Sequence, residues 1–201
     1  FSLIPVLPVA VLAASAGGTL EMSVLWIAES KTYLETSAML ADLNGDGLQE
    51  GILAGREELI AIDGAGKELW RWRTPGRFIT YPAVLMRANQ PPLIYAADNT
   101  GRLTCVDGTG KEIWHAQLNA PTISSAAVVC DLNGDGVSEV LQTDEKGTVW
   151  CFDSLTGTPI WQAQVSGIPV SPAVGDLNAD GTPEIVVATG AGLIFALDRS
   201  G

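Results

Sequence analysis

The chain has 201 residues, which is enough for one sizeable domain, and 47% of them are hydrophobic. Its 11 Lys and Arg residues are scattered against 23 Asp and Glu, a formal net charge of -12 that argues against a nucleic-acid partner. A single histidine excludes a histidine metal cluster, and the odd count of three cysteines argues against a disulfide framework.

The first 18 residues, FSLIPVLPVAVLAASAGG, form an apolar N-terminal arm that belongs to no repeat. The arm looks like the apolar core and cleavage site of a secretory signal, but no initiator Met or basic segment precedes it. It is short for a membrane span of about 20 residues and contains Pro5 and Pro8, so we predict no membrane span. Such an arm must be buried, either by its own domain or by a neighbouring subunit, and we predict that it is an assembly segment.

Three nine-residue loops carry the oxygen atoms that a calcium site needs: 42–50 (DLNGDGLQE), 131–139 (DLNGDGVSE) and 176–184 (DLNADGTPE). Oxygen-bearing side chains stand at loop positions 1, 3, 5 and 9, the backbone carbonyl at position 7 is a further donor, and Gly at position 6 allows a tight turn. We therefore predict three bound calcium ions. The predicted ligands are Asp42, Asn44, Asp46, Leu48, Glu50, Asp131, Asn133, Asp135, Val137, Glu139, Asp176, Asn178, Asp180, Thr182 and Glu184.

The alternative for each loop is a polar hairpin turn without a metal. An EF-hand begins in the same way, but its closing Glu stands at position 12 and helices flank it, whereas these loops run directly into strand sequences such as EIVVAT (184–189). The loops hold nine of the 23 carboxylates, so three calcium ions would bring the net charge to about -6. Loops of this kind favour an extracellular or cell-surface location, where calcium is abundant.

A second repeated pattern is AIDGAGKELW (61–70), CVDGTGKEIW (105–114) and CFDSLTGTPIW (151–161). Its tryptophans, Trp70, Trp114 and Trp161, lie 44 and 47 residues apart. A period near 45 residues with several short strands per unit is typical of propeller blades. We therefore predict an all-β fold, a four-bladed β-propeller of four-stranded blades over residues 19–201.

Two units depart from the pattern. Unit two has Arg87 at the first loop position and lacks the carboxylates, so we predict no calcium there. The fourth unit reaches Gly201 without a Trp, whereas residues 19–29 carry Trp26, 44 residues before Trp70. We predict that residues 19–29, from the same chain or from a neighbour, close the last blade beside the segment Leu193 to Asp198.

The loop pattern DxNxDGxxE resembles the calcium loops of FG-GAP repeats in integrin-type propellers. The pattern AxDxxxGxxxW, clearest in CFDSLTGTPIW, resembles the repeat of pyrroloquinoline-quinone-like propellers. Together the resemblances cover residues 19–201, and they imply a blade architecture with calcium in three loops. No quinone site is marked in the sequence, so calcium is the one cofactor that we predict.

Cys105 and Cys151 stand where other units have Ala61 and Ala196, so we predict that they fill a small-residue position between blades. No nucleophile–base pair is visible, so we do not predict an enzyme. The preferred prediction is a secreted, calcium-stabilised structural protein that self-assembles through its N-terminal arm into an extracellular filament of identical copies. The alternative is an extracellular binding module, such as a lectin or adhesin, with a carbohydrate or protein ligand.

Overall fold

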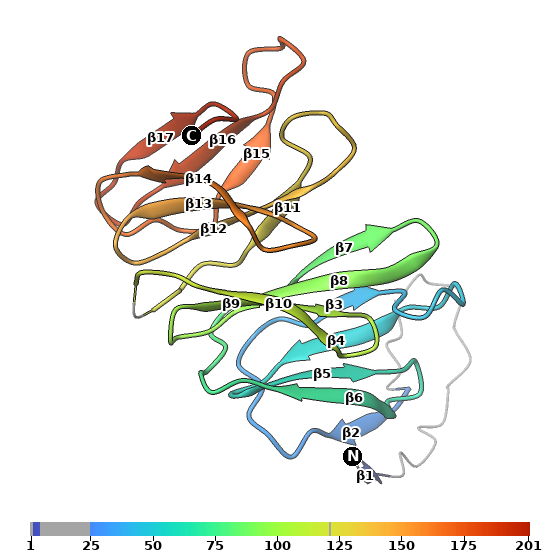
Figure 1. The fold of residues 1–201 in the computed structure, drawn as a ribbon. Coiled ribbons are helices and arrows are strands. Elements are labelled where there is room, and N and C mark those ends of the chain that lie inside the picture. The colour runs from blue at the N-terminus through green and yellow to red at the C-terminus, as the bar shows by residue number, and fades with distance from the viewer. Residues whose placement is uncertain (1, 5–24, 121) are drawn as a thin grey trace, which may run out of the picture.

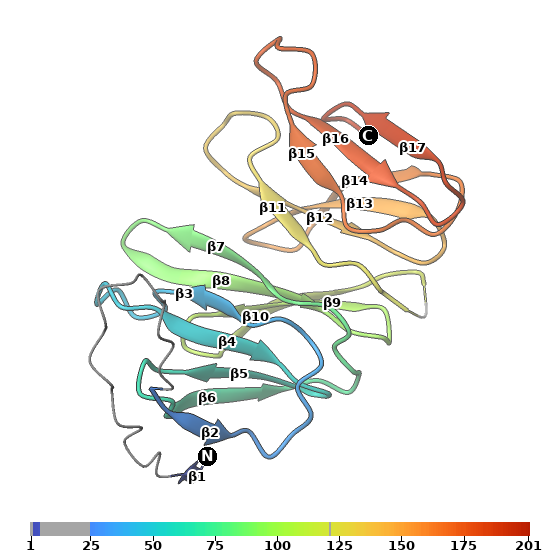
Figure 2. The ribbon, with the colours of Figure 1, turned by 180° about the vertical axis from the view of Figure 1, so that it is seen from behind.

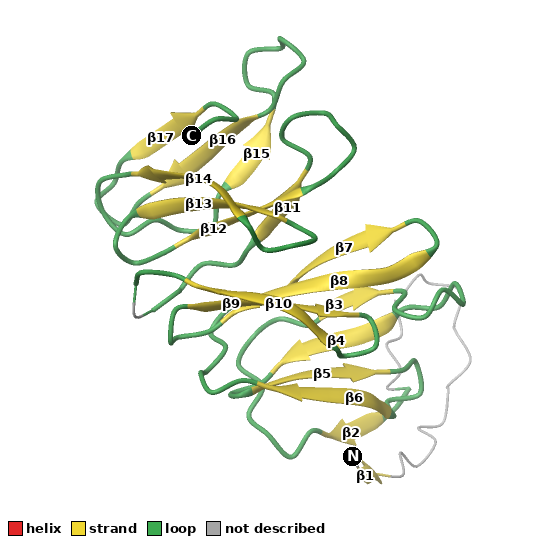
Figure 3. Ribbon diagram, viewed as in Figure 1, coloured by secondary structure: helices red, strands yellow, loops and turns green. Residues whose placement is uncertain are grey.

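The computed structural model describes residues 2–4, 25–120 and 122–201, and every regular element in them is a β-strand (Figure 3). The described residues contain no helix of the length and hydropathy that a membrane span requires. The first sheet contains β3 (Met39–Ala41), β4 (Glu50–Ala54), β5 (Glu58–Ile62) and β6 (Glu68–Arg73), and the second contains β7 (Ala83–Arg87), β8 (Gln90–Ala97), β9 (Arg102–Asp107) and β10 (Glu112–Gln117). The third contains β11 (Val128–Cys130), β12 (Glu139–Thr143), β13 (Thr148–Asp153) and β14 (Pro159–Gln164). The fourth contains β15 (Ala173–Gly175), β16 (Glu184–Ala188) and β17 (Ile194–Leu197). Two further strands, β1 (Ser2–Ile4) and β2 (Ile27–Glu29), form a separate two-stranded sheet.

Each sheet is an antiparallel meander in which strands that follow one another in the chain are paired. Asp side chains form the tight turns between the third and fourth strands. In the second sheet, Asp107 Oδ1 accepts hydrogen bonds from the backbone N–H of Thr109 (2.9 Å) and Lys111 (3.1 Å). Such Asx turns satisfy backbone groups that the strands leave unpaired, which explains why an Asp recurs at this point of every unit.

The sheets are stacked one after another, with β2 and the first sheet at one end and β15–β17 at the other (Figures 1 and 2). One apolar cluster fills each of the three spaces between consecutive sheets. Cys105 and Cys151 lie in two of these clusters and are fully buried, as is Ala61 at the equivalent position of the first sheet. The prediction that these positions hold small residues between units is therefore confirmed for Ala61, Cys105 and Cys151, whereas the equivalent Ala196 of the fourth sheet is exposed.

The repeat tryptophans join each unit to the next. The indole Nε1 of Trp26, Trp70, Trp114 and Trp161 donates to a backbone carbonyl 38 to 40 residues further along the chain, at 2.9, 2.8, 2.9 and 3.0 Å. Each ring lies against a glycine of the next unit. A Cβ atom on Gly110, for example, would come within 2.7 Å of Trp70 Cδ2. The tryptophans therefore act in packing between units.

The predicted closure of the last blade is not formed in the described residues. β2 pairs antiparallel with β1, with Leu3 opposite Ala28, and β17 pairs with β16 alone. The apolar clusters hold consecutive sheets face to face in a row, which leaves the first and last sheets apart (Figure 1). Residues 19–24, which we also predicted to take part, and residues 5–18 of the arm lie outside the described residues.

Candidate metal centre

The three acidic loops connect the first and second strands of the first, third and fourth sheets. Their closing glutamates begin the second strands β4, β12 and β16. The loop between β15 and β16 projects from the end of the molecule in Figure 1. All predicted ligands of one loop therefore come from a single connection, and each loop is a local site within one unit.

The loop of the third sheet folds around its own acidic side chains. The Asp131 carboxylate accepts hydrogen bonds from the backbone N–H of Gly134 at 2.7 Å and of Gly136 at 2.8 Å. Asn133 Oδ1 accepts from the N–H of Asp135 at 2.8 Å, and Asp135 Oδ1 accepts from the N–H of Val137 at 2.7 Å. These bonds curl the chain so that the alternate side chains at positions 1, 3 and 5 lie on the inside of the loop.

The same bonds recur in the other two loops. Asp42 and Asp176 accept from the N–H of Gly47 and of Gly181, both at 2.9 Å. The glutamate at position 9 accepts from the backbone N–H at position 2 at 2.8 Å in all three loops, donated by Leu43, Leu132 and Leu177. The sequence repeat is therefore also a repeat of conformation.

The asparagine at position 3 lies where the acidic side chains meet. Asn178 Nδ2 donates to Asp180 Oδ2 at 2.9 Å and to Glu184 Oε1 at 3.1 Å, and Asn44 Nδ2 makes the corresponding bonds at 3.1 and 3.5 Å. The positive end of the amide dipole thus occupies the point between two carboxylates. A cation at that point would meet the same carboxylate oxygens.

The donor set fits calcium by type, because carboxylate, amide and carbonyl oxygens are the ligands that this ion prefers. Within the described residues, no three Asp, Glu, His or Cys side chains are already gathered as a metal cluster. At position 1, both oxygens of Asp131 accept hydrogen bonds from backbone N–H groups. The amide bonds to two carboxylates in the loops of Asn44 and Asn178, and Asn133 Nδ2 donates to Glu139 Oε1 at 3.2 Å in the third sheet.

The protonation behaviour of the carboxylates follows from these contacts. The N–H of Gly136 is the main cause that lowers the pKa of Asp131, and the N–H of Gly47 does the same for Asp42. Burial raises the pKa of Glu139, and the negative charges of Asp131 and Asp135 add to that rise. A divalent cation between these groups would relieve their mutual repulsion.

Unit two replaces the loop by a short hairpin. Arg87 pairs with Gln90 across the turn, and Asn89 adopts the left-handed conformation there with φ of 57°. The Arg87 guanidinium donates through Nε at 2.9 Å, and also through Nη2, to the carbonyl of Pro91. A side-chain cation thus satisfies a carbonyl at the place where the other units have their acidic loops. The sequence showed that carboxylates are missing here, but not this contact.

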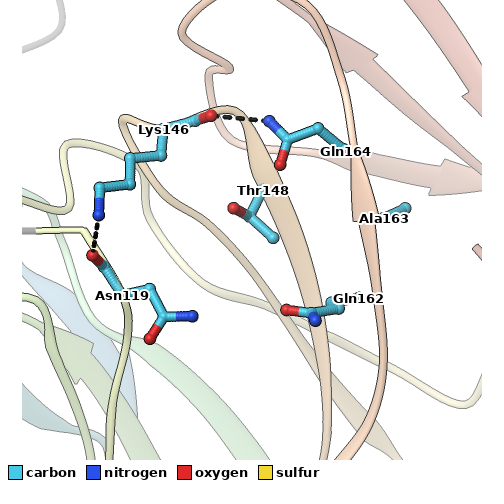
Figure 4. Close-up of a pocket in the computed structure, with 6 residues that line it drawn as sticks. All are labelled: Asn119, Lys146, Thr148, Gln162, Ala163 and Gln164. Carbon is cyan, nitrogen blue, oxygen red and sulfur yellow. Dashed lines mark hydrogen bonds between the residues drawn. The ribbon is translucent and has the colours of Figure 1, made fainter.

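Two further hollows lie away from the loops. One, of about 680 Å³, is lined by polar side chains of β13, β14 and nearby turns (Figure 4). In it Lys146 Nζ donates to the Asn119 carbonyl at 2.5 Å, and Gln164 Nε2 donates to the Lys146 carbonyl at 2.7 Å. The other, of about 320 Å³, is lined by segments that precede the first strand of all four sheets: Glu35, Thr36, Ser37, Ile79, Thr80, Tyr81, Ser124, Ala126 and Ser171.

Comparison with known proteins agrees with this architecture. Residues 131–187, which contain two complete acidic loops, 131–139 and 176–184, match the FG-GAP-like repeat. The structure is similar to that of BamB from Moraxella catarrhalis, a protein of pyrroloquinoline-quinone-like propeller repeats, with a TM-score of 0.62 and 17% identity over 86% of this chain and 48% of BamB. The fold is that of a β-propeller repeat protein. Both resemblances that we drew from the sequence are therefore confirmed.

Two other structures share the propeller repeat fold. BBS1N, solved in complex with ARL6DN, has a TM-score of 0.66 and 14% identity over 85% of this chain and 56% of its own. The computationally designed Ika4 protein has a TM-score of 0.67 and 11% identity over 89% of this chain and 99% of its own. The chain thus spans about half the length of BamB and BBS1N. Among curated proteins, none matches it in sequence.

Proposed function

We propose that this protein is a calcium-stabilised structural β-propeller module that works outside the cell, has no catalytic activity and assembles with copies of itself. The observation that carries the proposal is the common conformation of the three acidic loops, in which an asparagine amide N–H lies beside the closing glutamate. Three such loops repeated on one scaffold fit a stabilising role better than a single reactive centre.

An extracellular setting agrees with the calcium chemistry. Each loop offers three carboxylates on an exposed connection, a set suited to the millimolar affinities of extracellular calcium modules. The remaining reactive groups support a non-catalytic role. Burial raises the pKa of Cys105 and of Cys151 to about 12, which keeps both thiols protonated at neutral pH, and His115 Nδ1 lies 2.8 Å from Glu112 Oε1 on an exposed strand.

A thermal-unfolding experiment tests the calcium part. Each site that is saturated to 100 times its dissociation constant adds about 2.7 kcal/mol, so we expect a clear rise in Tm with calcium and three ions per chain by elemental analysis. Asp131→Ala should remove part of that rise. The matched control is Asp107→Ala, since Asp107 also accepts backbone N–H bonds but lies outside the acidic loops. Equal Tm values in calcium and in chelator would contradict the proposal.

The arm of residues 1–18 is the proposed filament contact. Its apolar composition supports this role, because exposed apolar surface is unfavourable by roughly 25 cal/mol per Å². A chain without residues 1–17 should still fold and bind calcium but give no filaments in negative-stain micrographs. Filaments of normal length from the truncated chain would contradict this part of the proposal.

A binding module is the second candidate, and the hollow lined by all four units favours it. That hollow gathers hydroxyl groups, one carboxylate and the ring of Tyr81, which is 45% exposed. Hydroxyls beside an exposed aromatic ring suit a carbohydrate ligand. Binding on a glycan array that Tyr81→Ala abolishes would support this candidate over the structural role.

A further inference from the structure

The third unit has a hollow at the place where the first two units have ion pairs. Three positions on the last two strands of these sheets are equivalent, because they have the same strand pairing relative to the repeat tryptophan. These positions hold Glu58, Glu68 and Arg71 in the first sheet, Arg102, Glu112 and His115 in the second, and Thr148, Pro159 and Gln162 in the third.

Charged side chains bond to one another at these positions in the first two units. Arg71 Nη2 lies 2.8 Å from Glu68 Oε2, and Arg71 also pairs with Glu58. In the second unit, Arg102 Nη2 lies 2.8 Å from Glu112 Oε1. The third unit has an uncharged residue at all three positions, and there the structure has a hollow of about 680 Å³. That volume lies within the range of small-molecule sites, about 300–1,000 Å³.

The backbone around the hollow is held in place by side chains. Gln164 Nε2 donates to the Lys146 carbonyl at 2.7 Å, as Gln117 Nε2 donates to the Thr100 carbonyl at 2.7 Å in the second unit. Lys146 Nζ donates to the Asn119 carbonyl at 2.5 Å and so connects a turn of the third sheet to the segment that follows β10. The hollow is therefore a fixed gap between the second and third units.

The side chains that line the hollow have polar groups to offer a ligand. The amides of Asn119 and Gln162 and the hydroxyl of Thr148 face the same space as the Lys146 side chain (Figure 4). In the described part of the chain, these two amides and the hydroxyl have no hydrogen-bond partner. The described residues that line the hollow include no carboxylate. A ligand would therefore meet one ammonium group, a hydroxyl and amides, without a fixed negative charge.

We infer that this hollow binds an acidic saccharide, a sugar that carries a carboxylate. An ammonium group only donates hydrogen bonds, so Lys146 binds the carboxylate. Amides and hydroxyls both donate and accept, as sugar hydroxyls do, so Asn119, Thr148 and Gln162 bind the hydroxyl groups of the ring. The site is separate from the hollow that contains Tyr81, and it goes beyond the proposed calcium and assembly roles.

The charge of the whole chain favours a short ligand. The formal net charge of -12 repels a long polyanion over its whole length, whereas the attraction of Lys146 acts on one carboxylate at close range. The ligand is therefore one or two sugar rings with a single carboxylate at the ammonium group. Binding should weaken as salt is added.

The first test removes the ammonium group. The full chain is applied to an array of short oligosaccharides of glucuronic, galacturonic and mannuronic acid and of glucose, galactose and mannose. We expect it to retain acidic members, and Lys146→Gln to weaken the best of them about tenfold or more in calorimetry, because a hydrogen bond between charged groups is lost. Lys111→Gln is the matched control, since this exposed lysine lies in a turn of the second sheet. Retention of no acidic member, or equal losses in the two variants, would overturn the inference.

The second test fills the hollow with the ion pair of the second unit. The double variant Thr148→Arg with Pro159→Glu places the Arg102 and Glu112 side chains at the equivalent positions of the third sheet. We expect the protein to unfold at a similar temperature and the acidic oligosaccharide no longer to bind. Unchanged affinity in this variant would place the binding elsewhere and overturn the inference.

Two further measurements separate this site from the proposed functions. Binding should persist in chelator, since no residue of the acidic loops lines the hollow among those described, and it should persist in Tyr81→Ala. If Tyr81→Ala abolishes binding of the acidic oligosaccharide, the ligand belongs to the other hollow and the inference is wrong. An absent effect of calcium on Tm would contradict the calcium proposal alone.

Discussion

Gly110 has φ of +83°, and the Trp70 ring occupies the space that a side chain would need. Gly66, Gly157 and Gly201 meet Trp26, Trp114 and Trp161 in the same way. The glycine in the third-to-fourth-strand turn is therefore required twice, once for the left-handed backbone and once for the indole ring of the preceding unit.

We predict that Gly110→Ala destabilises the protein by about 2–4 kcal/mol, because the methyl group both strains the backbone and displaces the Trp70 ring. Gly192→Ala is the control. Gly192 has φ of +78° but no atom within 4 Å of the added Cβ, so its cost should be the backbone strain of about 1 kcal/mol. Urea unfolding at fixed calcium compares the two variants, and equal losses would show that the indole contact adds nothing.

At the scale of the element, the short hairpin of unit two and the acidic loops occupy the same place in their sheets but satisfy their polar groups with different side chains. Both connect the first and second strands of a sheet. The hairpin uses the Arg87 guanidinium on the Pro91 carbonyl, whereas the loops bring carboxylates together. Unit two should therefore be indifferent to calcium.

Replacing Arg87 by Met tests this difference. The variant should lose about 1 kcal/mol, the net value of one hydrogen bond, and lose it equally in calcium and in chelator. Asp131→Ala should cost stability mainly when calcium is present. Chemical denaturation of both variants in the two buffers gives the comparison, and a calcium-dependent loss for Arg87→Met would show that the hairpin is coupled to a metal site.

The elements were predictable from the sequence because their signals are local. The Asp, Asn, Gly and Glu positions of each loop, and the Asp, Gly and Trp of each turn, lie within about ten residues of one another. The bonds between Asn178 and Glu184 were not predictable. They depend on side-chain rotation, which the spacing of residues does not determine.

At the scale of the whole molecule, the repeat of similar antiparallel sheets followed from the period, but the way in which the ends of the stack are placed did not. Trp26 bonds to the turn of the first sheet as Trp70 bonds to that of the second, yet the sequence does not say how far each sheet turns against the last. Small differences in that angle add up over four sheets. Whether the ends meet is therefore decided by the side chains of the three interfaces together, and in this structure they remain apart.

The hydrogen bonds of the repeat tryptophans to residues later in the sequence also affect how the chain folds during synthesis on the ribosome. Each indole N–H bonds to a carbonyl 38 to 40 residues later in the sequence. The contacts of one unit can therefore form completely only after most of the next unit has left the ribosome. Synthesis proceeds from the N-terminus and folding follows it. The apolar interface of the most recently synthesised unit would then be exposed to solvent, while the interfaces of earlier units are already buried. A pause in translation would leave that one interface accessible to proteases or chaperones.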